Sequence, residues 1–153
     1  MDKASAAGRR VVARVLVRGR PWGPRGNGSV IQIDVDVPDR PGELGKLAAV
    51  LADAGVNINR VSGESGGGRA YLSLFVNEPT KARTALKAAG YEPTDRTILV
   101  VRLDDRPGAL ADLAKRLGAA GVNITSVIHL ETVGGHAQLA IGVDDLAKAR
   151  GLV

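Results

Sequence analysis

Cysteine is absent from this sequence of 153 residues. Its absence excludes disulfide bonds, thiolate catalysis and any zinc or iron–sulfur site that depends on cysteine ligands. Histidine is scarce as well, since the chain holds only His129 and His136. On the hairpin predicted for this region the two imidazoles lie several residue pairs apart, too far to ligate one metal ion. The sequence therefore predicts no metal site.

Motifs that would indicate an enzyme are also missing. The chain has no Ser/His/Asp arrangement, no HExxH motif and no phosphate-binding loop. The stretch "GESGGGRA" (63–70) is rich in glycine, but it lies between two predicted antiparallel strands rather than between a strand and a helix. A hairpin turn explains it. We expect no enzymatic activity and no cofactor.

Long apolar runs are lacking too, because none approaches the roughly 20 residues that span a bilayer. The seven-residue run at 11–17 is interrupted by Arg14 and followed by Arg18 and Arg20, so it does not form the core of a signal peptide. We expect a cytoplasmic protein that does not bind membranes.

Positive charge is concentrated at the N-terminus. Residues 1–28 hold seven Lys or Arg and one Asp, a net charge of +6, whereas the other 125 residues hold fourteen basic and fifteen acidic residues, a net charge of −1. We interpret 1–27 as a basic, flexible leader. The nearly neutral body offers little to a phosphate backbone, so nucleic acid is not the expected partner. The segment "RGRP" (18–21) resembles a minor-groove hook, which keeps a nucleic-acid-binding regulator open as an alternative.

A twenty-residue phrase occurs twice, as "DRPGELGKLAAVLADAGVNI" (39–58) and "DRPGALADLAKRLGAAGVNI" (105–124), with thirteen identical positions. Around the first copy, alternation predicts strands at 30–37, 57–62 and 70–76, and helical spacing of Leu44, Leu47, Leu51 and Ala54 predicts a helix from Glu43. A helix at 78–90 and a short strand at 91–94 follow. The order restarts with a strand at 97–103, a helix at 108–120 and a hairpin of 123–131 with 136–143.

This β-α-β-β-α-β order predicts an α+β fold of two ferredoxin-like units, 28–95 and 96–153, in which each sheet has the strand order 4-1-3-2. The second unit ends within its second helix, so it is truncated before its last strand and leaves an edge beside 97–103. Our hypothesis is that "VVARVLV" (11–17) supplies the missing strand. A disordered leader is the alternative.

The outer sheet faces of the two units differ. Gln32, Asp34 and Asp36 point outward from the first strand of unit 1, and their counterparts in unit 2 are Ile98, Val100 and Arg102. The more apolar face of the second unit predicts packing against another such unit, in the same chain or in a second copy.

The strand that ends in "VPDRPGELGKL" (37–47), the helix after it and "AGVNINRVS" (54–62) resemble an ACT domain, and 103–127 resembles it again. The likeness covers everything except the leader. It implies a stand-alone tandem ACT protein that binds a small amino acid or related metabolite where two units meet. The residues that the resemblance assigns to the ligand are Asp39, Arg40, Gly42, Leu44, Asn57 and Ile58, with Asp105, Arg106, Gly108, Leu110, Asn123 and Ile124.

The chemistry of these residue types fits the ligand-binding roles that the resemblance implies. The orphan amides of a helix N-terminus beside Gly42 or Gly108 favour a carboxylate, and the asparagines offer both a donor and an acceptor. Each residue type also has a structural alternative. The two Asp residues could cap their helices, the Gly residues could serve the turn only, the Asn residues could tolerate a left-handed backbone, and the Arg residues could be solvated or bind an interface carboxylate.

We therefore expect a non-enzymatic regulatory protein, a homodimer, that passes a ligand signal to an enzyme or another regulator. A protein-interaction module without a ligand is the second alternative.

Overall fold

The computed structural model describes residues 23–24 and 26–153, so the segment 11–17 and most of the predicted leader lie outside the described residues. The elements are β1 (Gly28–Pro38), α1 (Glu43–Asp53), β2 (Ile58–Gly66), β3 (Arg69–Val76), α2 (Pro79–Ala88), β4 (Thr94–Asp104), α3 (Ala109–Ala119), β5 (Ile124–Val133), β6 (His136–Val143) and α4 (Leu146–Arg150). The fold is α+β with two ferredoxin-like repeats, as predicted. None of the described helices is both long and apolar enough to cross a bilayer.

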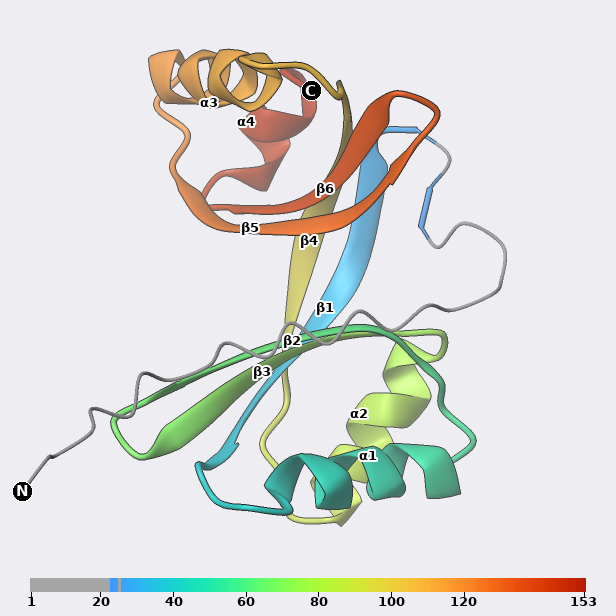
Figure 1. Ribbon diagram of the computed structural model, residues 1–153. Helices are drawn as coiled ribbons and strands as arrows, with labels where there is room; N and C mark the ends of the chain where they lie inside the picture. The colour runs from blue at the N-terminus through green and yellow to red at the C-terminus, as the bar shows by residue number, and fades with distance from the viewer. Residues whose placement is uncertain (1–22, 25) are drawn as a thin grey trace, which may run out of the picture.

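The strands form one antiparallel sheet in the order β2-β3-β1-β4-β6-β5, rather than two separate sheets. The long strands β1 and β4 lie at its centre and belong to both units (Figure 1). Residues 33–38 of β1 pair with β3, while residues 28–34 pair with β4. In the same way, residues 94–100 of β4 pair with β1 and residues 99–104 pair with β6.

This sharing completes the second unit. The start of β1, Gly28–Ile31, lies beside Thr97–Val100 of β4, in the place that we expected 11–17 to fill. Beyond it, the amide of Arg102 donates to Asn27 Oδ1 at 3.0 Å, which closes the next position along the edge. The start of β4 serves unit 1 in turn. The strand predicted at 97–103 begins earlier, at Thr94, whereas residues 91–93 of the strand predicted at 91–94 are not in a strand. The predicted boundary between residues 95 and 96 falls inside β4.

Each unit has its own helix-covered core, and the two helical layers lie at opposite ends of the molecule (Figure 1). Leu47 and Leu51 of α1 are fully buried in unit 1, and their counterparts Leu113 and Leu117 are buried in unit 2. The predicted helical stripe was wrong at Leu44, which is 51% exposed because it lies one residue past the buried position Glu43.

A third cluster fills the space between the two halves of the sheet. Phe75 of β3 packs there with Ile98 and Val100 of β4, Leu130 of β5 and Ala140 of β6. The apolar outer face predicted for unit 2 is therefore covered by unit 1 of the same chain. Because the two open sheet faces meet, residues predicted to face water on β1 lie close to β5.

Candidate functional site

Gly42 and Gly108 occupy equivalent positions before α1 and α3. Both adopt φ 90°, in the left-handed region, and neither helix receives a hydrogen bond from a capping side chain. Capping by Asp39 or Asp105 was therefore the wrong alternative. A Cβ at Gly42 would meet no atom within 4 Å, so the need for glycine comes from the backbone angle. Both loops are exposed. The first amides of the helices, those of Glu43 and Ala109, donate to the carbonyl oxygens of Arg40 and Arg106, and neither helix has a capping side chain.

The loop arginines bind carboxylates of their own units. Arg40 Nη2 lies 3.0 Å from Glu43 Oε1, and Lys46 Nζ lies 3.1 Å from the same oxygen. The hydrogen bond from Lys46, with that from Arg40, holds the pKa of Glu43 below its ordinary value, against the opposing effect of desolvation. In unit 2, Arg106 Nη2 contacts Asp112 Oδ2 at 2.9 Å. Neither contact reaches a second unit, so neither arginine binds an interface carboxylate within this chain.

Leu44 and Leu110 follow the glycines and are exposed to 51% and 46%, which places two apolar side chains beside the exposed helix N-termini. The exposed loop of unit 1 also borders a hollow of about 190 Å³, lined by Asp39, Arg40 and Leu44 with the end of β2.

Asn57 and Asn123 precede Ile58 and Ile124, which begin β2 and β5. The backbone N–H of Asn57 donates to Asn77 Oδ1, and the backbone N–H of Asn123 donates to Asp144 Oδ1, each at 2.9 Å. A register shift follows Ile58 and Ile124 alike. No non-glycine residue in the described part of the chain has a positive φ, so a left-handed asparagine was also the wrong alternative.

The two halves of the predicted site lie apart within each unit. Gly42 and Asn57 lie beyond opposite ends of α1, whose 11 residues span about 16 Å. Gly108 and Asn123 are separated by α3 in the same way. A ligand that touches a glycine loop and the start of a second strand must therefore bridge different units.

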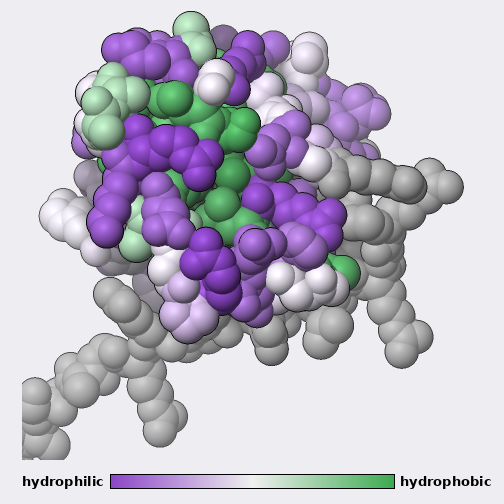
Figure 2. All heavy atoms as spheres, turned by 90° about the horizontal axis from the view of Figure 1, so that it is seen from above, coloured by the Kyte–Doolittle hydropathy of each residue, from purple (hydrophilic) through white to green (hydrophobic). Residues whose placement is uncertain are grey.

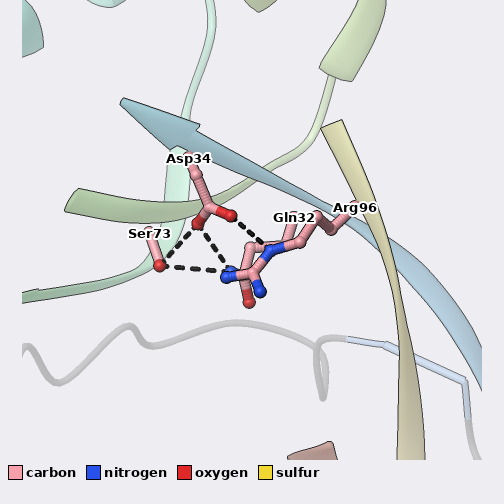
Figure 3. A network of polar contacts seen from close by, with 4 residues as sticks. All are labelled: Gln32, Asp34, Ser73 and Arg96. Carbon is pink, nitrogen blue, oxygen red and sulfur yellow. Dashed lines mark hydrogen bonds and ion pairs between the residues drawn. The ribbon is translucent and has the colours of Figure 1, made fainter. Parts of the chain in front are cut away.

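Sequence reasoning missed a cleft of about 720 Å³ between the two units. It is lined by β1, β2, β3 and the start of β4 on one side and by residues 125–128 of β5 on the other. Asp34 lies at its centre, where Oδ1 accepts from Gln32 Nε2 and Ser73 Oγ, both at 2.6 Å, and Oδ2 accepts from Arg96 Nε at 2.5 Å (Figure 3). The alternation of polar and apolar residues in β1 could have indicated a polar sheet face here. That β5 lies opposite this face was not predictable from the sequence.

Comparison with known families decides the assignment. The model of the ACT domain matches the chain twice, at residues 31–90 and 97–148. The chain belongs to the ACT-domain family. No curated protein matches this ACT-domain protein.

Solved structures share the fold. Protein BT0572 from Bacteroides thetaiotaomicron has a TM-score of 0.73 at 22% identity, over 81% of this chain and 85% of that one. The ligand-free regulatory subunit of aspartate kinase from Thermus thermophilus has a TM-score of 0.56 at 22% identity, and that from Thermus flavus 0.54 at 20%. Both cover 76% of this chain and 86% of theirs. These likenesses concern the fold.

Proposed function

We propose that this ACT-domain protein is a non-enzymatic regulator of the cytoplasm that binds a small amino acid or related metabolite at its glycine loops and signals to a partner. The observation that carries the proposal is the pair of exposed helix N-termini without a capping side chain at Gly42 and Gly108, in loops of the same conformation. Uncapped amides at a helix N-terminus attract a carboxylate. Asp39 and Asp105, which cap neither helix, are available to an ammonium group. Similarity to regulatory subunits of aspartate kinase supports a regulatory role.

The proposed assembly is a homodimer. The glycine loops do not face Asn57 or Asn123 of their own unit, and in the proposed dimer a second copy brings the start of β2 or β5 opposite them. Apolar side chains are exposed in equivalent pairs, Leu44 with Leu110 and Val61 with Val127. Seen from the side of α3 and α4, a band of apolar surface runs between polar side chains (Figure 2). Such surface favours self-association.

In this mechanism the ligand shifts the equilibrium between two arrangements of the copies. A metabolite bound across the contact between copies stabilises the arrangement that forms the site, and a partner protein recognises that arrangement. The free energy available for this shift is the difference between the binding free energies of the ligand for the two arrangements.

A thermal-shift screen of the full chain over the common amino acids tests the proposal. A binder stabilises the fold by RT ln(1 + [L]/Kd), which is about 2.7 kcal/mol at 100 times Kd. The D39N/D105N variant should lose most of this shift, while D53N, which changes an exposed carboxylate at the other end of α1, should keep it. Sedimentation velocity with and without the ligand reports the dimer. Absence of a shift with every amino acid would favour the interaction module that needs no ligand.

A further inference from the structure

The cleft between the two units contains no residue of either glycine loop, although it shares Gly63, Glu64 and Leu72 with the hollow beside the loop of unit 1. None of the residues expected to bind the ligand at those loops lines it. It lies on the opposite face of the sheet from α1 and α2, where β1 and β3 of unit 1 meet β5 of unit 2. Its volume of about 720 Å³ falls in the range of small-molecule sites. Because both units contribute walls, an occupant would contact both.

Two buried polar atoms in this cleft have no hydrogen-bond partner among the described residues. The Gln32 side chain is 1% exposed, and its Nε2 donates to Asp34 Oδ1 and to Ser73 Oγ. This orientation is fixed, because an amide oxygen in the place of Nε2 would face the Asp34 carboxylate. Gln32 Oε1 therefore points away from Asp34 and remains unsatisfied (Figure 3). On the β5 wall, Ser126 Oγ is buried and equally unsatisfied.

Unsatisfied acceptors are rare in protein interiors, because a buried polar atom loses its water without gaining a partner. Gln32 Oε1 can only accept a hydrogen bond, so the group that satisfies it must be a donor. Ser126 Oγ can accept from a donor as well. Of these two atoms, Gln32 Oε1 requires an N–H or O–H group, whereas the Ser126 hydroxyl can either donate or accept.

The charges around the cleft select among such donors. Its walls hold four carboxylates, those of Asp34, Asp36, Glu64 and Glu92, and one cation, Arg96. Arg96 neutralises Asp34, and Arg69 lies 2.5 Å from Asp36 Oδ2. Glu64 and Glu92 have no ion pair with any described residue. Two uncompensated carboxylates in the same cleft as an unsatisfied acceptor favour a cation that donates hydrogen bonds.

We propose that this cleft binds a small organic cation with primary ammonium groups, of the class of diamines and amino acids with a basic side chain. The carboxylates of Glu64 and Glu92, which lie on β2 and just before β4, attract the ammonium groups, and a donor of the bound molecule satisfies Gln32 Oε1. Since β5 of unit 2 forms one wall, the bound cation holds the two units against each other.

Isothermal titration of the full chain with 1,4-diaminobutane, lysine and arginine tests this site, with glutamate as the anionic control. We expect the cations to bind and glutamate not to bind. The E64Q/E92Q variant should weaken cation binding at least about tenfold, the effect of losing one charge-assisted hydrogen bond. The matched variant E78Q, at an exposed glutamate outside the cleft, should bind as the unchanged chain does.

A second variant probes the buried polar atoms. S126A removes one unsatisfied atom without removing any hydrogen bond among the described residues, so the fold should persist and the affinity for the cation should fall. The proposal is overturned if no cation binds at millimolar concentration, or if glutamate binds equally well. Binding that survives E64Q/E92Q but is lost in D39N/D105N would overturn it too, and would support the glycine loops instead. Failure of the loops to bind an amino acid leaves this measurement unaffected.

Discussion

Glu43 is a buried charged residue that has no charged counterpart in the second repeat. It is the first residue of α1, it is 8% exposed, and it receives contacts from both Arg40 and Lys46. The equivalent position in the second phrase is Ala109, which is buried without a charge. The twin phrases therefore have similar backbones and different electrostatics at the loops where ligands are proposed to bind.

The lowered pKa of Glu43 predicts a pH-dependent contribution to stability. A carboxyl group with a lower pKa in the folded chain stabilises the fold above its unfolded pKa, about 4.3, and that contribution is lost as the pH falls through the folded pKa. E43Q should therefore be less stable than the unchanged chain at pH 7, and the difference should shrink at acid pH. Urea midpoints measured from pH 7 to pH 3 test this, with D53N as the control. A difference that stays constant over this range would contradict it.

The sequence identified the residues of the two loops but not their surroundings. Gly42 and Gly108 were predictable as turn residues, since the phrase repeats and glycine favours a positive φ. That Glu43, and not Leu44, faces the core was not predictable, because the helical stripe fits either alignment until the position of the sheet is known.

At the scale of elements, β5 and β6 approach closely at Gly142. Ser126 is the partner of Gly142 after the register shift in β5. A Cβ at Gly142 would lie 2.4 Å from Ser126 Oγ and 2.9 Å from Thr125 Oγ1. The corresponding position of β3 is Phe75, which fills the space between the units. Gly142 on β6 leaves room for Ser126, while Phe75 at the equivalent position of β3 fills the space between the two sheet faces.

G142A should destabilise the protein by about 1–3 kcal/mol, because an added methyl group in a packed sheet forces side chains out of their positions. G66A is the matched control, since a Cβ at Gly66 meets nothing within 4 Å and the residue lacks a positive φ. Chemical denaturation of both variants measures the difference. Equal stability of the two variants would show that Ser126 and Thr125 move aside at no cost.

The elements themselves were largely predictable, and the joining of two of them was not. Alternation located the strands, and the glycine pairs Gly67–Gly68 and Gly134–Gly135 marked the hairpins, where they adopt positive φ. In the polar start of β4, Asp95 and Arg96 gave no strand signal of their own. This segment is a strand because β1 pairs with it, and pairing between distant segments leaves no local pattern.

At the scale of the whole molecule, each unit borrows its fourth strand from the other. The cleft between the units follows from this exchange, because β1 and β4 hold the two open sheet faces against each other around Phe75. If the two units are treated as independent and consecutive along the sequence, neither the shared strands nor the cleft is predicted. The duplicated loops could be predicted from local sequence alone. The cleft could be recognised only once the arrangement of the strands in space was known.

The shared strands predict that the two units unfold together. Leu47 and Leu113 are equivalent core residues of α1 and α3, and each is almost completely buried. Replacing either by alanine should cost about 2–5 kcal/mol. Because unfolding one unit removes β1 or β4 from the other, L47A should reduce hydrogen-exchange protection of the slowest amides in α3 as much as in α1, and L113A should do the same in reverse. Loss of protection confined to the mutated unit in either variant would mean that the units unfold independently, despite their common strands.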